Sequence, residues 1–143
     1  MMPKELAKAH ENGDLYFHDL DSYNLTINCL HIPTKEVLER GFNTGYGTIK
    51  KPKRIETAAE LSCILLQSSQ NDMFGGQSHV EFDNDLDVFI EPTRKEIRNE
   101  LIELGIDDKK IEAITEKKLK DRVHQAMQGI VYNLNTMHVR PVA

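Results

Sequence analysis

The sequence predicts a mostly α-helical domain with a few short strands near its amino-terminal end. Two observations lead to this expectation. Apolar residues recur at helical spacings of three and four over most of the chain after residue 55. Residues 14–32, in contrast, are rich in aromatic and β-branched side chains, which favour strands. The 143 residues are enough for one hydrophobic core, so we expect a single domain.

Glycines mark the ends of several predicted helices. The expected elements are a helix over 3–12, one or two strands within 14–32, and helices over 34–41, 55–70, 85–104 and 108–136. Gly13, Gly41 and Gly105 stand at the ends of three predicted helices, where glycine adopts left-handed backbone angles without steric cost. We therefore expect the last two helices to meet at Gly105.

Two Thr-x-x-Glu patterns predict capping boxes at helix starts. They are Thr57 with Glu60 and Thr93 with Glu96. In a capping box the threonine hydroxyl accepts a hydrogen bond from a free backbone amide, and the glutamate reaches back to the threonine amide. Residues 43–54 and 68–78 contain glycines and polar side chains, so they predict loops on either side of the helix that begins at Ile55.

Composition and charge restrict the classes of function. With 39% hydrophobic and 29% charged residues, the chain has the composition of an ordinary folded protein. A formal net charge of −5 argues against nucleic-acid binding, because such binding depends on clustered Lys and Arg. No apolar run approaches the roughly 20 residues of a membrane span, and the amino terminus lacks an apolar signal core. We expect a cytoplasmic protein that binds neither nucleic acid nor membrane.

The two cysteines, Cys29 and Cys63, are the first candidates for chemistry, and both are expected to be reduced thiols. Cys29 ends a strand-like run, where a thiol can project into a pocket as a nucleophile, a hydrogen-atom donor or a radical carrier. The alternative is a buried thiol that acts as a small hydrophobic side chain. Cys63 lies among Leu and Ile residues and is expected to be such a core residue.

An acidic cluster with one histidine offers a second candidate site. His18, Asp19 and Asp21 could bind a divalent metal ion, as in phosphohydrolases built around a His-Asp pair. The alternative is a turn in which the two aspartates accept backbone amide hydrogen bonds. The sequence favours the turn. It contains no Cys/His cluster with zinc spacing, so we expect no bound metal.

A basic cluster precedes the predicted helix over 55–70. It consists of Lys50, Lys51, Lys53 and Arg54. Cations beside a helix amino terminus form a reasonable phosphate-binding site. The alternative is a solvated surface loop without a ligand.

Three longer segments resemble one family. They are HENGDLYFHDLDSYNLTINCLHI, GFNTGYGTIKKPKRIETAAELSCILLQSSQNDMFGGQSHVEFDNDL and VHQAMQGIVYNLNTMH, which together span His10 to His138. In this order they resemble the front part of the catalytic subunit of anaerobic (class III) ribonucleoside-triphosphate reductases. The resemblance implies an α/β fold, a ten-stranded barrel of the glycyl-radical type. Residues 1–143 would then be a single partial catalytic domain of this barrel.

The resemblance also implies a function. Members of this family reduce ribonucleoside triphosphates to deoxyribonucleoside triphosphates by radical chemistry. They use a glycyl radical made by a radical-SAM activase, formate as reductant and a structural zinc, and they form homodimers that bind nucleotide effectors. The residue that matches the substrate-facing cysteine of an early barrel strand is Cys29. Lys50, Lys51, Lys53 and Arg54 fall in the region that binds effector phosphates.

The sequence also departs from the family pattern. It contains no glycyl-radical motif, no finger-loop cysteine and no four-cysteine zinc site. We therefore expect a fragment that holds no cofactor and is inactive alone. Two alternatives stay open: a non-catalytic helical remnant that dimerises or binds nucleotide effectors, and a metal-dependent phosphohydrolase that uses His18 and Asp19.

Overall fold

The computed structural model describes residues 2–17, 29–70, 73 and 75–136. The elements in chain order are α1 (Lys4–Glu11), β1 (Leu30–Ile32), α2 (Thr34–Arg40), β2 (Phe42–Asn43), β3 (Thr48–Ile49), α3 (Ile55–Gln70), β4 (Gln77–His79), α4 (Phe82–Asp87), α5 (Ile90–Glu103) and α6 (Asp108–Thr136). The described part is therefore mostly helical with a few short strands, as the sequence predicts. None of its helices is both long and apolar enough to cross a bilayer.

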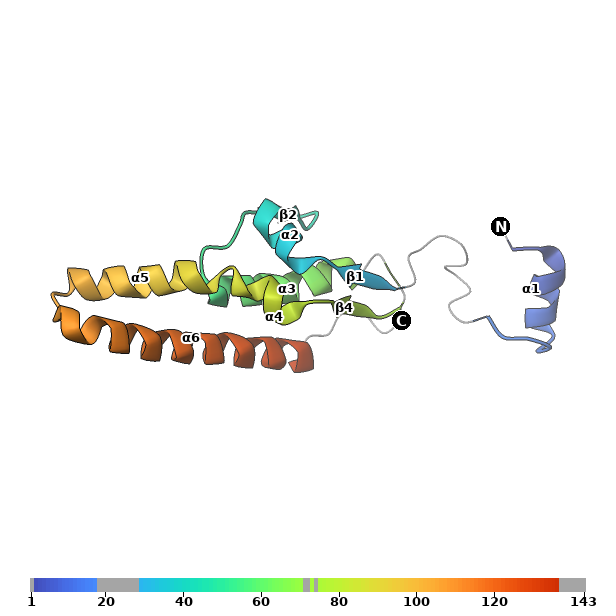
Figure 1. Ribbon diagram of the computed structural model, residues 1–143. Helices are drawn as coiled ribbons and strands as arrows, with labels where there is room; N and C mark the ends of the chain where they lie inside the picture. The colour runs from blue at the N-terminus through green and yellow to red at the C-terminus, as the bar shows by residue number, and fades with distance from the viewer. Residues whose placement is uncertain (1, 18–28, 71–72, 74, 137–143) are drawn as a thin grey trace.

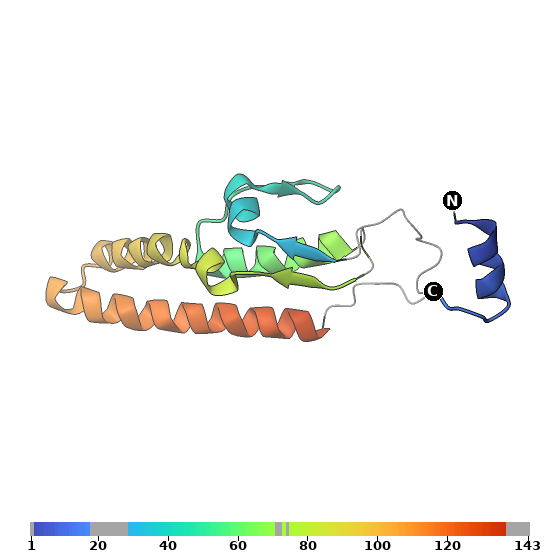
Figure 2. The ribbon, with the colours of Figure 1, turned by 45° about the vertical axis from the view of Figure 1, so that its right-hand side comes forward.

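Helix α6 is the longest helix of the described residues and packs against two others. It runs antiparallel to α5 in a long hairpin, and its carboxyl-terminal half packs against α3 (Figure 1). The hairpin turns at Gly105, which has a φ of 70°, so α5 and α6 meet where the sequence predicts. At the opposite end of the molecule, α1 lies apart from the other helices and buries none of its residues (Figure 2).

Two hydrophobic clusters form the core, and α6 contributes to both. The larger cluster joins α2, α3, α4 and α6 around Phe89 and contains Leu38, Ile55, Ala58, Ala59, Cys63, Leu86, Phe89, Ala126 and Ile130. The smaller cluster lies within the hairpin and contains Ile97, Leu101, Ile111 and Leu119. Apolar residues at spacings of three and four on α6 thus face α5 first and α3 further along.

Two separate two-stranded sheets are present in the described residues. β1 and β4 pair in parallel, with Leu30 opposite Gln77 and Ile32 opposite His79. β2 and β3 pair antiparallel in a hairpin. This hairpin corrects the prediction of a loop over 43–54. Of the predicted strand region 14–32, β1 is the only described strand; residues 14–17 form none, and residues 18–28 lie outside the described part.

The single helix predicted over 85–104 is wrong in one respect. The chain forms α4 and α5 there, and the break falls at Val88 and Phe89. The physical reason is Pro92, which lacks an amide hydrogen and is tolerated only in the first turn of a helix. Phe89 is 1% exposed, so the break also directs its ring into the core.

Both predicted capping boxes are wrong. Helix α3 begins at Ile55, two residues before Thr57, and Thr93 lies inside α5 rather than at its start. The Ile55 amide donates instead to the Thr93 hydroxyl, with a nitrogen–oxygen distance of 2.9 Å. The same hydroxyl donates to the carbonyl oxygen of Phe89 at 2.7 Å. The first amide of α3 is therefore satisfied by a side chain from another helix.

Candidate functional site

Cys29 lies immediately before β1 and is exposed. The amide of Leu30 donates to the carbonyl oxygen of Gly76 at 3.1 Å, which ties this point of the chain to the start of β4. Exposure alternates along the strand: Cys29 and His31 are exposed, Leu30 is half-buried and Ile32 is buried. Because strand side chains alternate between two faces, Cys29 and His31 share the exposed face. We call this surface of the β1–β4 pair, formed by Cys29, His31 and Ser78, the open face.

A hydrogen bond crosses the two strands on the open face. His31 Nδ1 and Ser78 Oγ lie 2.7 Å apart, and the two residues are direct partners in the parallel register. The pair is exposed, so its remaining hydrogen-bonding groups are free to meet a ligand. Sequence reasoning missed both residues in this role, because Ser78 lies 47 residues after His31 and no local pattern joins them.

A second cross-connection lies on the opposite, buried face of the strands. The Thr34 hydroxyl is hydrogen-bonded to His79 Nδ1, and Thr34 is fully buried. Burial lowers the pKa of His79 below its ordinary value, and the neighbouring Asp85 carboxylate partly opposes this effect. The contact joins the start of α2 to the end of β4, so it holds β1 and β4 in register beneath the open face.

Cys63 occupies the larger core cluster, and its prediction as a core residue is confirmed. Burial raises the pKa of its thiol above the ordinary value, while a hydrogen bond with Asn133 acts in the other direction. A protonated, enclosed thiol is a poor nucleophile. Of the two cysteines, Cys29 is therefore the one that a ligand can reach.

The four residues of the basic cluster have different surroundings. Lys51 Nζ lies 3.0 Å from Glu39 Oε1, and this hydrogen bond lowers the pKa of the Glu39 carboxyl. Arg54 Nε lies 2.7 Å from Glu96 Oε2. Lys50 and Lys53 form no ion pair with another described residue. Two of the four cations are thus already paired with carboxylates.

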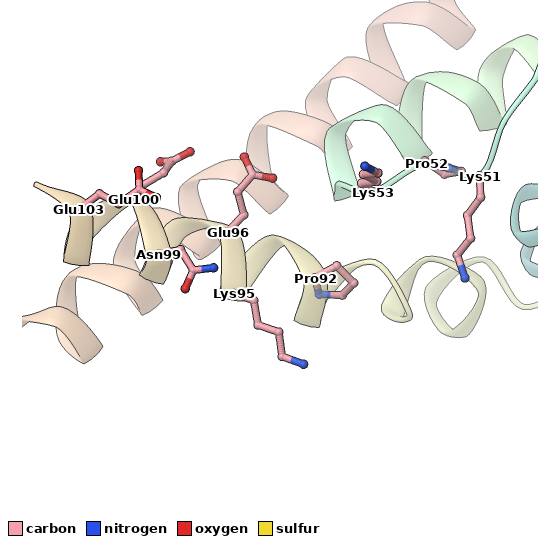
Figure 3. A pocket seen from close by; sticks show the side chains of 9 residues that line it. All are labelled: Lys51, Pro52, Lys53, Pro92, Lys95, Glu96, Asn99, Glu100 and Glu103. Carbon is pink, nitrogen blue, oxygen red and sulfur yellow. The ribbon is translucent and has the colours of Figure 1, made fainter.

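Lys51 and Lys53 line a groove of about 640 Å³ between α5 and the segment that leads into α3 (Figure 3). Its lining residues are Lys51, Pro52, Lys53, Pro92, Lys95, Glu96, Asn99, Glu100 and Glu103. The structure adds Lys95, which sequence reasoning missed because it lies more than forty positions along the chain. Three lysines are matched by three glutamates, so the groove as a whole is close to neutral.

An arginine on α6 pairs with two of the glutamates that line this groove, Glu96 and Glu100. Arg122 lies 3.4 Å from a Glu56 oxygen on α3, and 3.6 and 3.7 Å from oxygens of Glu96 and Glu100 on α5. The cluster is partly buried, so its charges are screened less than those of a surface pair. It joins the three longest helices around one guanidinium.

Metal binding has no support in the described part of the chain. No group of three or more His, Cys, Asp or Glu side chains there is arranged to hold an ion. His18, Asp19 and Asp21 lie outside the described residues, so the structure does not test the predicted turn or the phosphohydrolase alternative.

Comparison with known proteins identifies the same family that the sequence motifs resemble. A family model described as anaerobic ribonucleoside-triphosphate reductase matches residues 1–141. The chain belongs to the anaerobic ribonucleoside-triphosphate reductase family.

Individual relatives carry the same name. Reductases of this name from Salmonella typhimurium and Escherichia coli are each 29% identical over 140 residues, which cover 96% of this chain and 19% of the relative. The bacteriophage T4 reductase is 28% identical over 96% of this chain and 23% of its own length. This chain thus spans about a fifth of the length of these relatives.

Proposed function

We propose that this chain forms part of the catalytic polypeptide of an anaerobic reductase that converts ribonucleoside triphosphates to deoxyribonucleoside triphosphates. The observation that carries the proposal is the family match over residues 1–141. The exposed position of Cys29 before a parallel strand pair supports a chemical role for this thiol. The isolated chain is proposed to be inactive.

In this proposal β1 and β4 belong to the ten-stranded α/β barrel that the resemblance implies. A barrel strand turns alternate side chains inward and outward. The open face would be the inward one, because the opposite side chains of β1 and β4 are already packed against the chain's own helices and loops. Cys29 would then face the barrel interior, where substrate lies.

The proposed role of Cys29 is hydrogen-atom donation. Its S–H bond breaks homolytically, the hydrogen atom passes to a carbon-centred radical of the substrate, and a C–H bond forms. The sulfur radical that remains would take a hydrogen atom from formate, the reductant that the resemblance implies. The carbon dioxide radical anion left behind would pass its electron, with a proton from solvent, to the oxidised sugar and leave as carbon dioxide, and the lost ribose hydroxyl leaves as water. The glycyl radical of the family would supply the initial radical chemistry. The described residues of this chain contribute the donor thiol and the strand that positions it.

A chimaeric enzyme tests this function. The 143-residue chain replaces the matched segment of the Escherichia coli relative, and deoxyribonucleotide formation is measured without oxygen in the presence of the activase and formate. We expect activity from the chimaera. Cys29→Ser should reduce it by about 10³-fold or more, because a group that reacts directly with the substrate is lost. Cys63→Ala is the matched control and should keep most of the activity. Full activity of the Cys29→Ser variant would remove the proposed role.

We propose a second role for the groove lined by Lys51, Lys53 and Lys95, as a site for nucleotide effectors. Lys51, Lys53 and Lys95 line it together with Glu96, Glu100 and Glu103, so phosphates would contact the lysines in place of these carboxylates, and Pro52 and Pro92 offer apolar surface for a base. Titration calorimetry of the chain with dATP and dTTP tests this role. We expect binding that weakens with added salt and with Lys53→Ala, while Lys50→Ala, outside the groove, serves as the control. Absence of heat with both nucleotides would exclude this second role.

A further inference from the structure

The open face carries more than the thiol. Cys29 and His31 are exposed on the same side of β1, and Ser78 stands beside His31 on β4. We propose that the His31–Ser78 pair binds the ribose hydroxyls of the nucleotide that Cys29 serves. This inference rests on the proposed function, which places the substrate against Cys29.

The chemistry of the pair suits a sugar hydroxyl. The bond between His31 Nδ1 and Ser78 Oγ leaves His31 Nε2 and one part of the serine hydroxyl free. If serine donates to Nδ1, then Nε2–H is a free donor and Oγ a free acceptor. If the imidazole donates from Nδ1–H instead, the serine O–H is the free donor and the unprotonated Nε2 of the neutral ring is a free acceptor. In each case the pair presents donors and acceptors side by side, and vicinal hydroxyls both donate and accept.

The spacing of the strands suits a pentose. Residues two apart on a strand are separated by about 6.6 Å, and neighbouring strands by about 4.8 Å. The Cys29 thiol and the His31–Ser78 pair therefore stand one strand repeat apart on the same surface. A sugar ring that lies across this surface can place one carbon at the thiol and its hydroxyls at the pair.

The charges next to His31 favour the sugar over the phosphates. His31 borders a pocket of about 460 Å³ at the carboxyl ends of β1 and β4. Carboxylates of Glu36, Glu81 and Asp85 line this pocket against the single ammonium of Lys35. An excess of carboxylates repels a triphosphate. The phosphates would then extend away from this pocket, and with one sugar carbon at the Cys29 thiol, the uncharged ribose is the part of the nucleotide that lies next to His31.

Protection of Cys29 from alkylation tests the inference on the 143-residue chain. Carbamidomethylation of each cysteine by iodoacetamide is followed by mass spectrometry without oxygen, and buried Cys63 reports whether the chain stays folded. ATP and CTP are compared with dATP and dCTP. We expect the ribonucleotides to slow the modification of Cys29 at about 5-fold lower concentration than the deoxyribonucleotides, the effect of one hydrogen bond.

Two variants test whether His31 and Ser78 cause the preference for ribonucleotides. Ser78→Ala and His31→Phe should abolish the preference for ribonucleotides, measured for each variant relative to its own rate without nucleotide. Ser68→Ala and His124→Phe, which lie elsewhere, are matched controls and should keep it. Equal protection by both nucleotide classes, no protection at all, or an unchanged preference in the two variants would overturn the inference. The proposed function fails separately, if Cys29→Ser retains activity in the chimaeric enzyme.

Discussion

At the scale of single residues, Cys29 and Cys63 show how position changes the properties of one side chain. Cys29 lies exposed beside a strand pair, and its thiol can reach a ligand. Cys63 lies in a core cluster, where burial raises the pKa of its thiol and stabilises the protonated form. The first arrangement suits hydrogen-atom transfer, and the second suits packing.

The buried thiol makes stability depend on alkaline pH. In the unfolded chain Cys63 loses its proton at about pH 8.5, whereas the raised pKa keeps it protonated in the folded chain to higher pH. The unfolded state therefore binds fewer protons, and the stabilisation present at neutral pH is lost as the pH rises through this window. Urea unfolding at pH 7 and pH 9.5 measures the loss. The loss should be smaller in Cys63→Ala; an identical loss in both proteins would contradict this explanation.

The sequence predicted correctly that Cys63 is a core residue, because Leu and Ile surround it within a few positions along a helix. The sequence did not predict the His31–Ser78 pair. That contact forms only when β1 and β4 align in parallel, and no property of either residue alone requires the alignment.

At the scale of elements, the start of α3 depends on a residue of another helix. The Thr93 hydroxyl accepts from the Ile55 amide and donates to the Phe89 carbonyl. Thr93→Val keeps the shape but leaves a buried amide without its partner, so we expect a loss of about 1–3 kcal/mol in the free energy of unfolding. Thr93→Ser retains the hydroxyl and is the control. Equal stability of the Val and Ser variants would show that the hydroxyl contributes nothing.

The turn after α2 requires a glycine at position 41. Gly41 has φ 77° and ψ 166°, a region open to almost no other residue, and an added Cβ would stand 2.3 Å from the Ile49 carbonyl oxygen. Gly105 also has a positive φ, but open space surrounds its Cβ position. Gly105→Ala should cost about 1–2 kcal/mol for the backbone strain alone. Gly41→Ala should lower the unfolding temperature further, and the opposite order would contradict this account.

Periodicity and glycines predicted the existence of the long helices, but the way two of them begin followed from other causes. Thr57 and Thr93 matched the spacing of capping boxes, and tertiary contact gave Thr93 a different partner. The break before α5 had a local signal in Pro92, because a proline restricts a helix to starting within the preceding turn. Pro92 alone therefore predicts a helix start in the turn before it, which is where the break lies.

At the scale of the whole molecule, α6 organises the chain. It packs against α5 and α3, and its Arg122 is surrounded by carboxylates from both. These contacts leave the β1–β4 pair at one end of the helical layer (Figure 1), and Cys29 and His31 on the open face are exposed. Among the described strands, β1 and β4 pair only with each other, which is the arrangement expected of a segment that completes its sheet with further strands at its edges. This agrees with the proposed place in a barrel.

The central claim is that Cys29 gives its hydrogen to the substrate, and reduction in D₂O by the chimaeric enzyme tests it most directly. A thiol exchanges its hydrogen with solvent, so Cys29 carries deuterium in D₂O. The account predicts a deoxyribonucleotide with a deuterium bound to carbon, which mass spectrometry detects after the product is returned to H₂O. Cys29→Ser should form almost no product. A product without carbon-bound deuterium, or one formed equally well by Cys29→Ser, would contradict the claim.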